Sequence, residues 1–290
     1  MTPGILLQYL LPHRLLSRIV FHATRWTWTP WKNLLIRQIS QRFKVDLGEA
    51  AEPDINAYAH FNAFFTRALK PGARPMSADA NVLVCPADGH VSQSGAIHGD
   101  RIFQAKGREF SAAELLGDAQ AAAAYADGQF ITIYLSPRDY HRVHMPMSGT
   151  LVATTHIPGR IFSVAPKAVE SIPRLFARNE RLVCHFEGAH GPFAVVLVGA
   201  LLVSSVSTVW GNLEIPPYAS RVNKRDYRGQ SIQLERGAEM GRFNMGSTVI
   251  LLLPAAGPCL DPGLVPEQAV RVRQDMGALG PGAEDRIDQA

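Results

Sequence analysis

The chain has 290 residues, of which 47% are hydrophobic and 19% charged. This length and composition suit a globular protein with an ample core, as one large domain or two small ones. Its three cysteines, Cys85, Cys184 and Cys259, are odd in number and form no CxxC pair, which argues against a disulfide framework or a cysteine zinc site and suits a reducing compartment.

The net charge of +4 is unevenly distributed along the chain. Residues 1–45 hold seven Lys or Arg and no Asp or Glu, which makes this segment +7. The other 22 basic and 25 acidic side chains give the remainder a charge of −3. The positive charge therefore lies at the N-terminal end.

The basic segment is also apolar. Its leucine-rich runs are interrupted by Arg14 and Arg18, and Pro12 and Pro30 divide it into short helices. Three of the four tryptophans follow closely: Trp26, Trp28 and Trp31. No charge-free apolar run approaches the ~20 residues needed to span a bilayer. A secretory signal is not indicated either, because no positive region precedes an uninterrupted apolar stretch.

Cationic groups, apolar faces and clustered Trp are typical of helices that lie on an anionic membrane surface. We therefore predict that residues 1–75 form a helical, basic, membrane-surface region. The alternative is a helical hairpin packed on the core, with its basic residues merely solvated. Nucleic-acid binding is a weaker third reading, because no recognition motif accompanies the charge.

Further along, residues 54–69 predict a helix closed by Lys70-Pro71-Gly72. Beyond residue 80, short β-branched and aromatic runs alternate with Gly and Pro, which predicts strands at 81–85, 129–135, 150–156, 182–186, 193–206, 248–253 and 269–273. Two helices are expected between them, at 112–124 and 167–176.

These elements predict an α+β fold, with a helical N-terminal region on a mainly antiparallel β core. The β-rich catalytic domain is expected to span residues 76–276. Residues 277–290 are expected to be a disordered tail.

The segment from Asn244 to Thr248 carries the most informative chemistry. Ser247 follows Gly246. Because Gly246 has no side chain, the serine hydroxyl can fold back onto the Gly246 carbonyl. Attack there converts the amide into an ester, and elimination across Cα and Cβ of the serine then cuts the chain and leaves a pyruvoyl ketone. Such a ketone is an electron sink made from the backbone itself. The alternative is an ordinary turn that leads into a buried strand.

Three further residues complete a possible relay with Ser247. Asp88 lies in a turn directly after a predicted strand, and His141 and His144 lie in the polar block at 134–146, after another strand. An Asp, His and Ser set supplies a base for the hydroxyl proton and a carboxylate to orient that base.

Each of these residues also has a plainer interpretation. Asp before Gly is commonly a turn former, and two histidines three residues apart can bind a metal, although no third ligand appears at a suitable spacing. Met245 stands where a G-x-S-x-G nucleophile elbow requires glycine, so Ser247 does not fit that motif. Three other histidines receive a structural role: His156, His185 and His190.

Taken together, the pieces resemble the phosphatidylserine decarboxylase family, and most closely its bacterial, membrane-associated members. They cover roughly residues 1–254 in the family's order: FNAFFTRALK at 61–70, PADG at 86–89, the block at 134–146, FSV at 162–164, LFARNER at 175–181 and GST at 246–248. The family usually has Leu where this chain has Met245, a swap of similar volume. The chain departs from the family pattern after Pro254.

The resemblance implies self-cleavage between Gly246 and Ser247, which leaves a β chain of residues 1–246 and an α chain of 44 residues. A pyruvoyl group made from Ser247 would be the only cofactor, with no metal. The resemblance also implies that Asp88, His144 and Ser247 form the processing triad, and that His141 assists decarboxylation by protonating the α-carbon.

The implied activity is conversion of phosphatidylserine to phosphatidylethanolamine and CO₂ by a homodimer bound peripherally to the cytoplasmic face of the inner membrane. The implied partners are the anionic membrane and the protein's own two chains, not nucleic acid. The alternatives are a serine hydrolase of lipid esters that uses the same triad, and a non-catalytic lipid-binding module. Pyruvoyl decarboxylases of soluble amino acids are disfavoured, because their substrates give no reason for a basic, Trp-rich N-terminus.

Overall fold

The computed structural model describes residues 3–201, 205–216, 220–245 and 248–280. Gly246 and Ser247, the predicted cleavage site, lie outside the described residues, as does the predicted tail from residue 281 onward. The residues on both sides of the cleavage site, Met245 and Thr248, are described.

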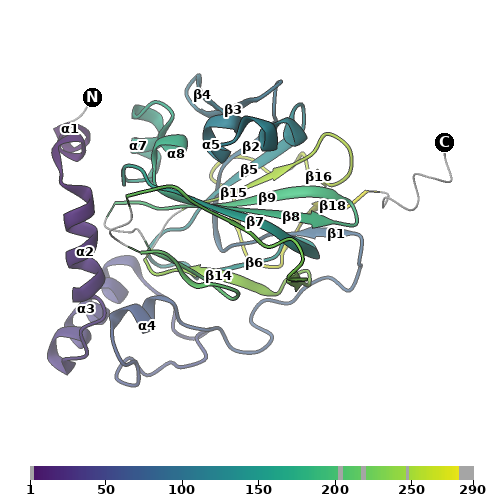
Figure 1. Ribbon diagram of the computed structural model, residues 1–290. Helices are drawn as coiled ribbons and strands as arrows, with labels where there is room; N and C mark the ends of the chain where they lie inside the picture. Colours follow the sequence, from purple (N-terminus) through teal and green to yellow (C-terminus); the bar gives the residue numbers. More distant parts are fainter. Residues whose placement is uncertain (1–2, 202–204, 217–219, 246–247, 281–290) are drawn as a thin grey trace, which may run out of the picture.

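Three helices form the N-terminal region: α1 (Pro3–Leu10), α2 (His13–Ala23) and α3 (Thr29–Phe43). Figure 1 shows them along one side of the molecule, away from the C-terminal end. Pro12 precedes α2 and Pro30 lies in the first turn of α3, which confirms the division into short helices.

The helix predicted at 54–69 is mostly wrong, because only α4 (Phe61–Phe65) forms. Upstream, the carboxylate of Asp54 accepts a hydrogen bond from the backbone N–H of Asn56, which stabilises a turn instead of a helix. His60 then caps α4 by accepting a hydrogen bond from the backbone N–H of Ala63.

The core is a nine-stranded sheet in which every pair of strands is antiparallel. In order across the sheet, its strands are β12 (Asn223–Asp226), β7 (Gly149–Ile157), β8 (Arg181–Gly188), β9 (Gly191–Val198), β15 (Thr248–Leu253), β5 (Gln129–Tyr134), β2 (Gly89–Ala96) and β17 (Ala269–Val270), with β13 (Gln233–Leu234) beside β7.

Three smaller sheets complete the fold. The four-stranded sheet contains β11 (Asn212–Ile215), β10 (Val206–Thr208), β14 (Glu239–Phe243) and β6 (Arg142–His144). A three-stranded sheet contains β1 (Val82–Val84), β18 (Asp275–Ala278) and β16 (Cys259–Leu260), and a hairpin contains β3 (Arg101–Ala105) and β4 (Arg108–Ser111).

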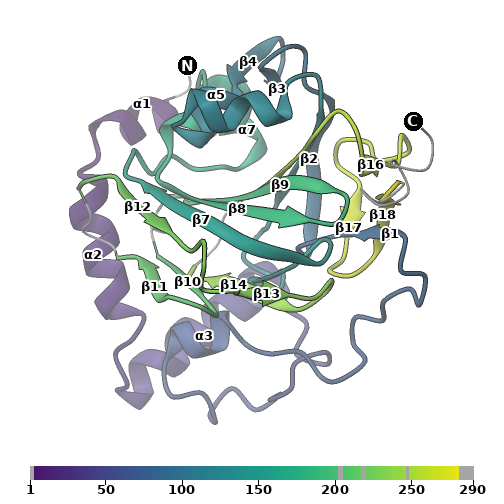
Figure 2. The same cartoon turned by 45° about the vertical axis from the view of Figure 1, so that its right-hand side comes forward.

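The nine-stranded sheet is covered on both faces (Figure 2), with α5 (Ala112–Leu116) and α7 (Pro166–Ser171) over one face and β10, β11 and β14 beneath the other. Side chains alternate along β15, so that Val249 and Leu251 join the core shared with β14, while Ile250 and Leu252 join the core shared with the helices. A strand buried on both faces explains the continuous apolar run at 249–253.

The α+β class and the antiparallel core are confirmed, but several boundaries differ from the prediction. The helix expected at 112–124 is divided into α5, α6 (Ala119–Ala122) and a 3₁₀ turn, because Gly117 adopts a left-handed φ of 67°. The helix expected at 167–176 breaks before α8 (Leu175–Arg178). The strand expected at 193–206 ends at Val198.

The C-terminal part also differs from the prediction. The strand expected at 269–273 is β17, which has only two residues. β18 follows it and extends past residue 277, where the tail was expected to begin, and Leu279 is still buried.

Candidate active site

The loop between β5 and β6 contacts the end of β14, before the predicted cleavage site, and follows the strand that pairs with the start of β15, after that site. On one side, the backbone N–H of Phe243 donates to the carbonyl oxygen of His141 at 3.0 Å. On the other side, Thr248 pairs with Tyr134 at the end of β5. The sequence from Tyr134 to His144 therefore contacts both the last residue of β14 and the first residue of β15.

His141 is fully buried, and its hydrogen bonding fixes its tautomer. Nδ1 lies 2.8 Å from the carbonyl oxygen of Asp139, and because a carbonyl only accepts, Nδ1 carries the proton. Among the described residues, Nε2 has no hydrogen-bond partner. Burial, aided by the nearby charge of Arg67, lowers the pKa of His141 to about 3. At neutral pH, the imidazole of His141 is therefore neutral, and the lone pair of its Nε2 is free of a proton.

His144 has the same tautomer but a different environment. Its Nδ1 lies 2.8 Å from the carbonyl oxygen of Gly237, and its Nε2 lies 3.1 Å from the hydroxyl of Tyr140. Burial lowers the pKa of His144 and raises the pKa of Tyr140 to about 12, so both side chains are neutral near pH 7. The Tyr140 phenol therefore donates its proton to Nε2 of His144.

Asp88 is held by groups other than His144. Its Oδ1 accepts from Nε of Arg74 at 3.0 Å and from the backbone N–H of Val272 at 2.8 Å. Arg74 also donates from Nη2 to Oδ2 of Asp88 and to Glu49. No hydrogen bond within the described part of the chain joins Asp88 to His144. The expectation that Asp88 orients His144 by direct contact is therefore corrected, because the Gly237 carbonyl takes that place.

Asp88 and His144 nevertheless belong to one region. The backbone N–H of His144 donates to the carbonyl oxygen of Pro86, two residues before Asp88, at 2.8 Å. Tyr140 borders the small cavity next to Asp88 and also the one next to His144. The structure thus brings Asp88, His141 and His144 together around Tyr140, and sequence reasoning assigned no role to Tyr140 although it lies within the block at 134–146.

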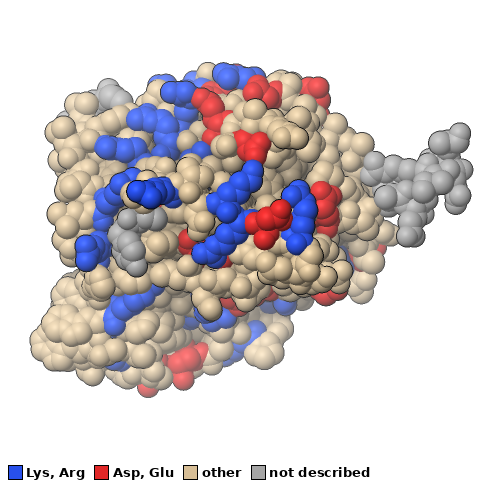
Figure 3. All heavy atoms as spheres, viewed as in Figure 1, with Lys and Arg blue, Asp and Glu red and all other residues tan. Residues whose placement is uncertain are grey.

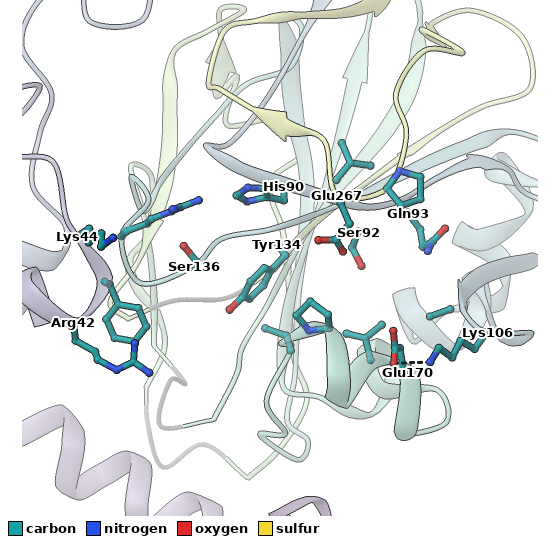
Figure 4. A pocket seen from close by; sticks show the side chains of 18 residues that line it. Arg42, Lys44, His90, Ser92, Gln93, Lys106, Tyr134, Ser136, Glu170 and Glu267 are labelled. Carbon is teal, nitrogen blue, oxygen red and sulfur yellow. Dashed lines mark ion pairs between the residues drawn. The ribbon is translucent and has the colours of Figure 1, made fainter. Parts of the chain in front are cut away.

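A cavity of about 620 Å³, which we call the main cavity, lies beside β2 and the end of β5. In Figure 4, Tyr134 lies in the middle of this cavity with His90 above it, Lys44 and Arg42 lie at one end, and the Lys106–Glu170 ion pair lies at the other. Apolar side chains contribute to its wall: Phe43, Val91, Val164 and Val169. Because Tyr134 pairs with Thr248, the main cavity reaches the start of β15.

The histidines expected to be structural lie away from the main cavity. His156 is in β7, buried, with Nε2 at 2.8 Å from a carboxylate oxygen of Glu180. His185 is in β8, and His190 lies in the turn after it. Among the described residues, no group of three or more His, Cys, Asp or Glu side chains is placed to bind a metal ion. No described helix is long and apolar enough to cross a membrane.

Comparison with known proteins identifies the class. A family model described as phosphatidylserine decarboxylase matches residues 61–278, and a second one, described as PSD, matches residues 3–44. Since the first match spans most of the chain, the protein belongs to the phosphatidylserine decarboxylase family.

Several curated relatives are similar over nearly their whole length. The phosphatidylserine decarboxylase proenzyme of Xanthomonas campestris pv. campestris (strain B100) is 60% identical over 271 residues, which are 93% of this chain and 96% of the relative. The proenzyme of Xanthomonas axonopodis pv. citri (strain 306) is 59% identical with the same coverage. That of Xylella fastidiosa (strain M23) is 57% identical over 93% of this chain and 92% of the relative.

Proposed function

We propose that this protein is a self-processing enzyme that decarboxylates phosphatidylserine to phosphatidylethanolamine and CO₂. The observation that carries the proposal is the family match at 61–278, which includes Asp88, His141, His144 and Ser247. The high identity to curated proenzymes supports both the reaction and the self-cleavage. A serine hydrolase is not favoured, because the relatives that match over 93% of the chain are named decarboxylase proenzymes.

In maturation, we assign the Ser247 hydroxyl as the nucleophile that attacks the Gly246 carbonyl. His144 takes the hydroxyl proton at Nε2. This nitrogen is the acceptor because Nδ1 carries the proton that is donated to the Gly237 carbonyl. Asp88 acts indirectly. Its contacts with Arg74 and Val272 fix the backbone before β2, where the Pro86 carbonyl accepts a hydrogen bond from the backbone N–H of His144. The amide C–N bond breaks as the ester forms. Elimination then removes the Cα proton of residue 247 and breaks its Cβ–Oγ bond, which leaves a carboxylate on Gly246 and a dehydroalanine at the start of the 44-residue α chain. The imine tautomer of this residue takes up water and loses ammonia to give the ketone.

The proposed cofactor is a pyruvoyl group formed from Ser247, and the surroundings of β15 fit it. Thr248 Oγ1 and His141 Nε2 are both buried without a hydrogen-bond partner among the described residues, and both lie beside the cleavage site. The ketone supplies a sink for the electrons released when the C–C bond to the carboxylate breaks. We assign to His141 the protonation of the substrate α-carbon from Nε2. Because Nε2 is unprotonated at neutral pH, it takes up this proton from solvent during turnover.

The orientation of α2 supports the proposed membrane association. The helix buries the polar side chains of His13 and Ser17 against the protein and exposes Leu15 and Ile19, the reverse of an ordinary surface helix. Other large apolar side chains on α1 and just before α3 are also about half exposed or more: Leu6, Leu7, Leu10, Trp26 and Trp28. In the view of Figure 3, Lys and Arg side chains are visible on the left half of the molecule, the half that contains these helices. Such a surface fits an anionic bilayer.

We therefore propose that the enzyme is peripheral, lies on the cytoplasmic face of the inner membrane and takes phosphatidylserine from it. A homodimer is the proposed assembly, on the family resemblance alone. Light scattering of the purified protein tests this assembly, and a mass of one protomer, 31.7 kDa, would contradict it.

The activity is tested with phosphatidylserine labelled at the serine carboxyl. The purified wild-type protein is expected to release labelled CO₂, and Ser247→Ala is expected to release none. Carbonyl reagents such as hydroxylamine are expected to inactivate the wild type. Release of fatty acid instead of CO₂ would favour the hydrolase.

A further inference from the structure

A small cavity next to the main cavity is lined by a buried arginine, Arg67, whose guanidinium is not fully hydrogen-bonded among the described residues. It has a volume of about 240 Å³ and is lined by Arg67, Asp88, Tyr140 and their neighbours. Lys44, His90 and Arg138 line both cavities, so the two are joined along these residues. We call the smaller one the side cavity. Figure 4 shows two of these shared residues, Lys44 at one end of the main cavity and His90 above Tyr134.

Arg67 is the most unusual residue of the side cavity. It is only 4% exposed, yet its Nε and Nη1 have no hydrogen-bond partner among the described residues. Its one hydrogen bond runs from Nη2 to the carbonyl oxygen of Arg138 at 3.1 Å. A buried guanidinium with two unpaired N–H groups is unfavourable unless an anion completes it.

The carboxylates of the side cavity are already engaged elsewhere. Asp88 accepts from Arg74, and Glu49 accepts from Arg74 and Arg271. Asp46 accepts from the backbone N–H of Gly48, and Asp139 accepts from the N–H and hydroxyl of Ser136.

Two further cations, Lys44 and Arg138, line the side cavity at exposed positions. Within the described chain, Lys44 forms no ion pair, and the exposed Arg138 lies 3.6 Å from Asp139. Together with Arg67, they leave a cationic pocket that an incoming oxyanion can complete.

We propose that Arg67, with Lys44 and Arg138, forms a subsite that binds the phosphodiester of the aminophospholipid. This inference rests on the proposed function and names the residues that hold its substrate. Phosphodiester oxygens match the planar fork of a guanidinium. The apolar wall of the main cavity, which contains Phe43 at the end of α3, is then left for the glycerol and acyl portion.

The phosphodiester is favoured over the serine carboxylate for an energetic reason. The carboxylate loses its charge as CO₂ leaves, so a cation bound to it would stabilise the ground state more than the transition state and slow the reaction. The phosphodiester keeps its charge throughout. It also lies only three bonds from the reacting α-carbon, which fits the closeness of Arg67 to His141.

The test uses Ser247→Ala protein, so that binding is measured on uncleaved chains. Dissociation constants are determined for dihexanoyl phosphatidylserine and dihexanoyl phosphatidylethanolamine, below their critical micelle concentrations. Arg67→Gln is expected to weaken the binding of both lipids about ten- to a hundredfold, the worth of one charge-assisted hydrogen bond. Lys44→Gln and Arg138→Gln, at exposed positions, are expected to weaken both by smaller factors. Arg101→Gln, on an exposed arginine paired with Glu109, is the matched control and is expected to change neither.

Weaker binding of phosphatidylserine alone would assign the subsite to the carboxylate and overturn the proposal, as would unchanged binding of both lipids. A fall in melting temperature with unchanged dissociation constants would make Arg67 a structural residue. In the processed enzyme, Arg67→Lys is expected to raise KM while keeping most of kcat. If the wild type bound both lipids through Arg67 but released no CO₂, the proposed function would fail and the subsite would stand.

Discussion

The hydroxyl oxygen of Tyr140 lies 3.1 Å from Nε2 of His144, on the nitrogen that the proposed maturation step needs as its base. The phenol and Ser247 therefore compete for one lone pair. A hydrogen bond donated to a neutral imidazole stabilises the neutral form, so Tyr140 adds to the effect of burial, which already lowers the pKa of His144.

Tyr140→Phe removes this hydrogen bond and leaves the ring of residue 140 in place. The pKa of His144 is expected to rise towards its ordinary value, because the hydrogen bond that favours the neutral imidazole is lost. Cleavage requires neutral His144, so its pH midpoint is expected to move upward while the rate on the alkaline plateau is kept or increased. The measurement is the appearance of the 44-residue fragment after cell-free synthesis at a series of pH values. A plateau rate reduced a hundredfold would mean that Tyr140 relays the proton instead of competing for His144.

His141→Ala tests the division of labour between the two histidines. The variant is expected to be cleaved normally, because Nε2 of His144 remains, but to lose decarboxylation by about 10²- to 10⁴-fold, the usual contribution of a general acid or base. Fragment masses and CO₂ release are measured on the same preparation. An uncleaved but natively folded His141→Ala protein would show that His141, whose Nε2 is the free base in the structure, acts in maturation.

Burial of neutral His141 predicts a loss of stability in acid. Its folded pKa of about 3 lies below the unfolded value of about 6.5, so its contribution is complete above pH 6.5 and is lost as the pH falls towards 3. Between pH 7 and pH 5, this group alone is expected to lower the free energy of unfolding by about 2 kcal/mol.

The check is urea unfolding of uncleaved Ser247→Ala protein with and without His141→Gln. The His141→Gln protein is expected to lose about 2 kcal/mol less than its parent over that pH range. His22→Gln, at an exposed histidine on α2, serves as the control. Equal losses with and without His141→Gln would contradict the neutral, buried state.

Leu15→Gln and Ile19→Gln test the membrane surface of α2, where both side chains are more than half exposed. Neither change disturbs the core, so the melting temperature is expected to stay constant. A protein that carries both substitutions is expected to bind vesicles that contain phosphatidylserine at least about tenfold more weakly, because two apolar side chains no longer enter the interface. Val265→Gln, with a valine of similar exposure in the C-terminal part, is the matched control. Equal vesicle binding by the wild type, the α2 variant and Val265→Gln would exclude α2 as the membrane contact.

Local patterns in the sequence predict much of the fold. Apolar runs such as 129–135 and 248–253 are found as strands almost to the residue, because each is buried within the nine-stranded sheet. The helix predicted at 54–69 fails because the periodic phenylalanines belong to a short α4, preceded by polar turns that sequence periodicity does not reveal.

The candidate site is predictable in its members but not in its contacts. Asp88, His141 and His144 were found from strand ends and from the family's motifs. That Arg74 holds Asp88, and that Gly237 and Tyr140 hold His144, depends on residues up to 93 positions apart. Arg67 stands within a recognised motif, but its burial without a partner becomes visible only in three dimensions.

The most direct measurement is the intact mass of the purified wild-type protein under denaturing conditions. We predict two polypeptides, residues 1–246 and a 44-residue fragment that begins at position 247 with a keto group and resists Edman degradation until its carbonyl is aminated. An active protein that consists of one unbroken chain of 31.7 kDa, with an ordinary serine at position 247, would contradict the account.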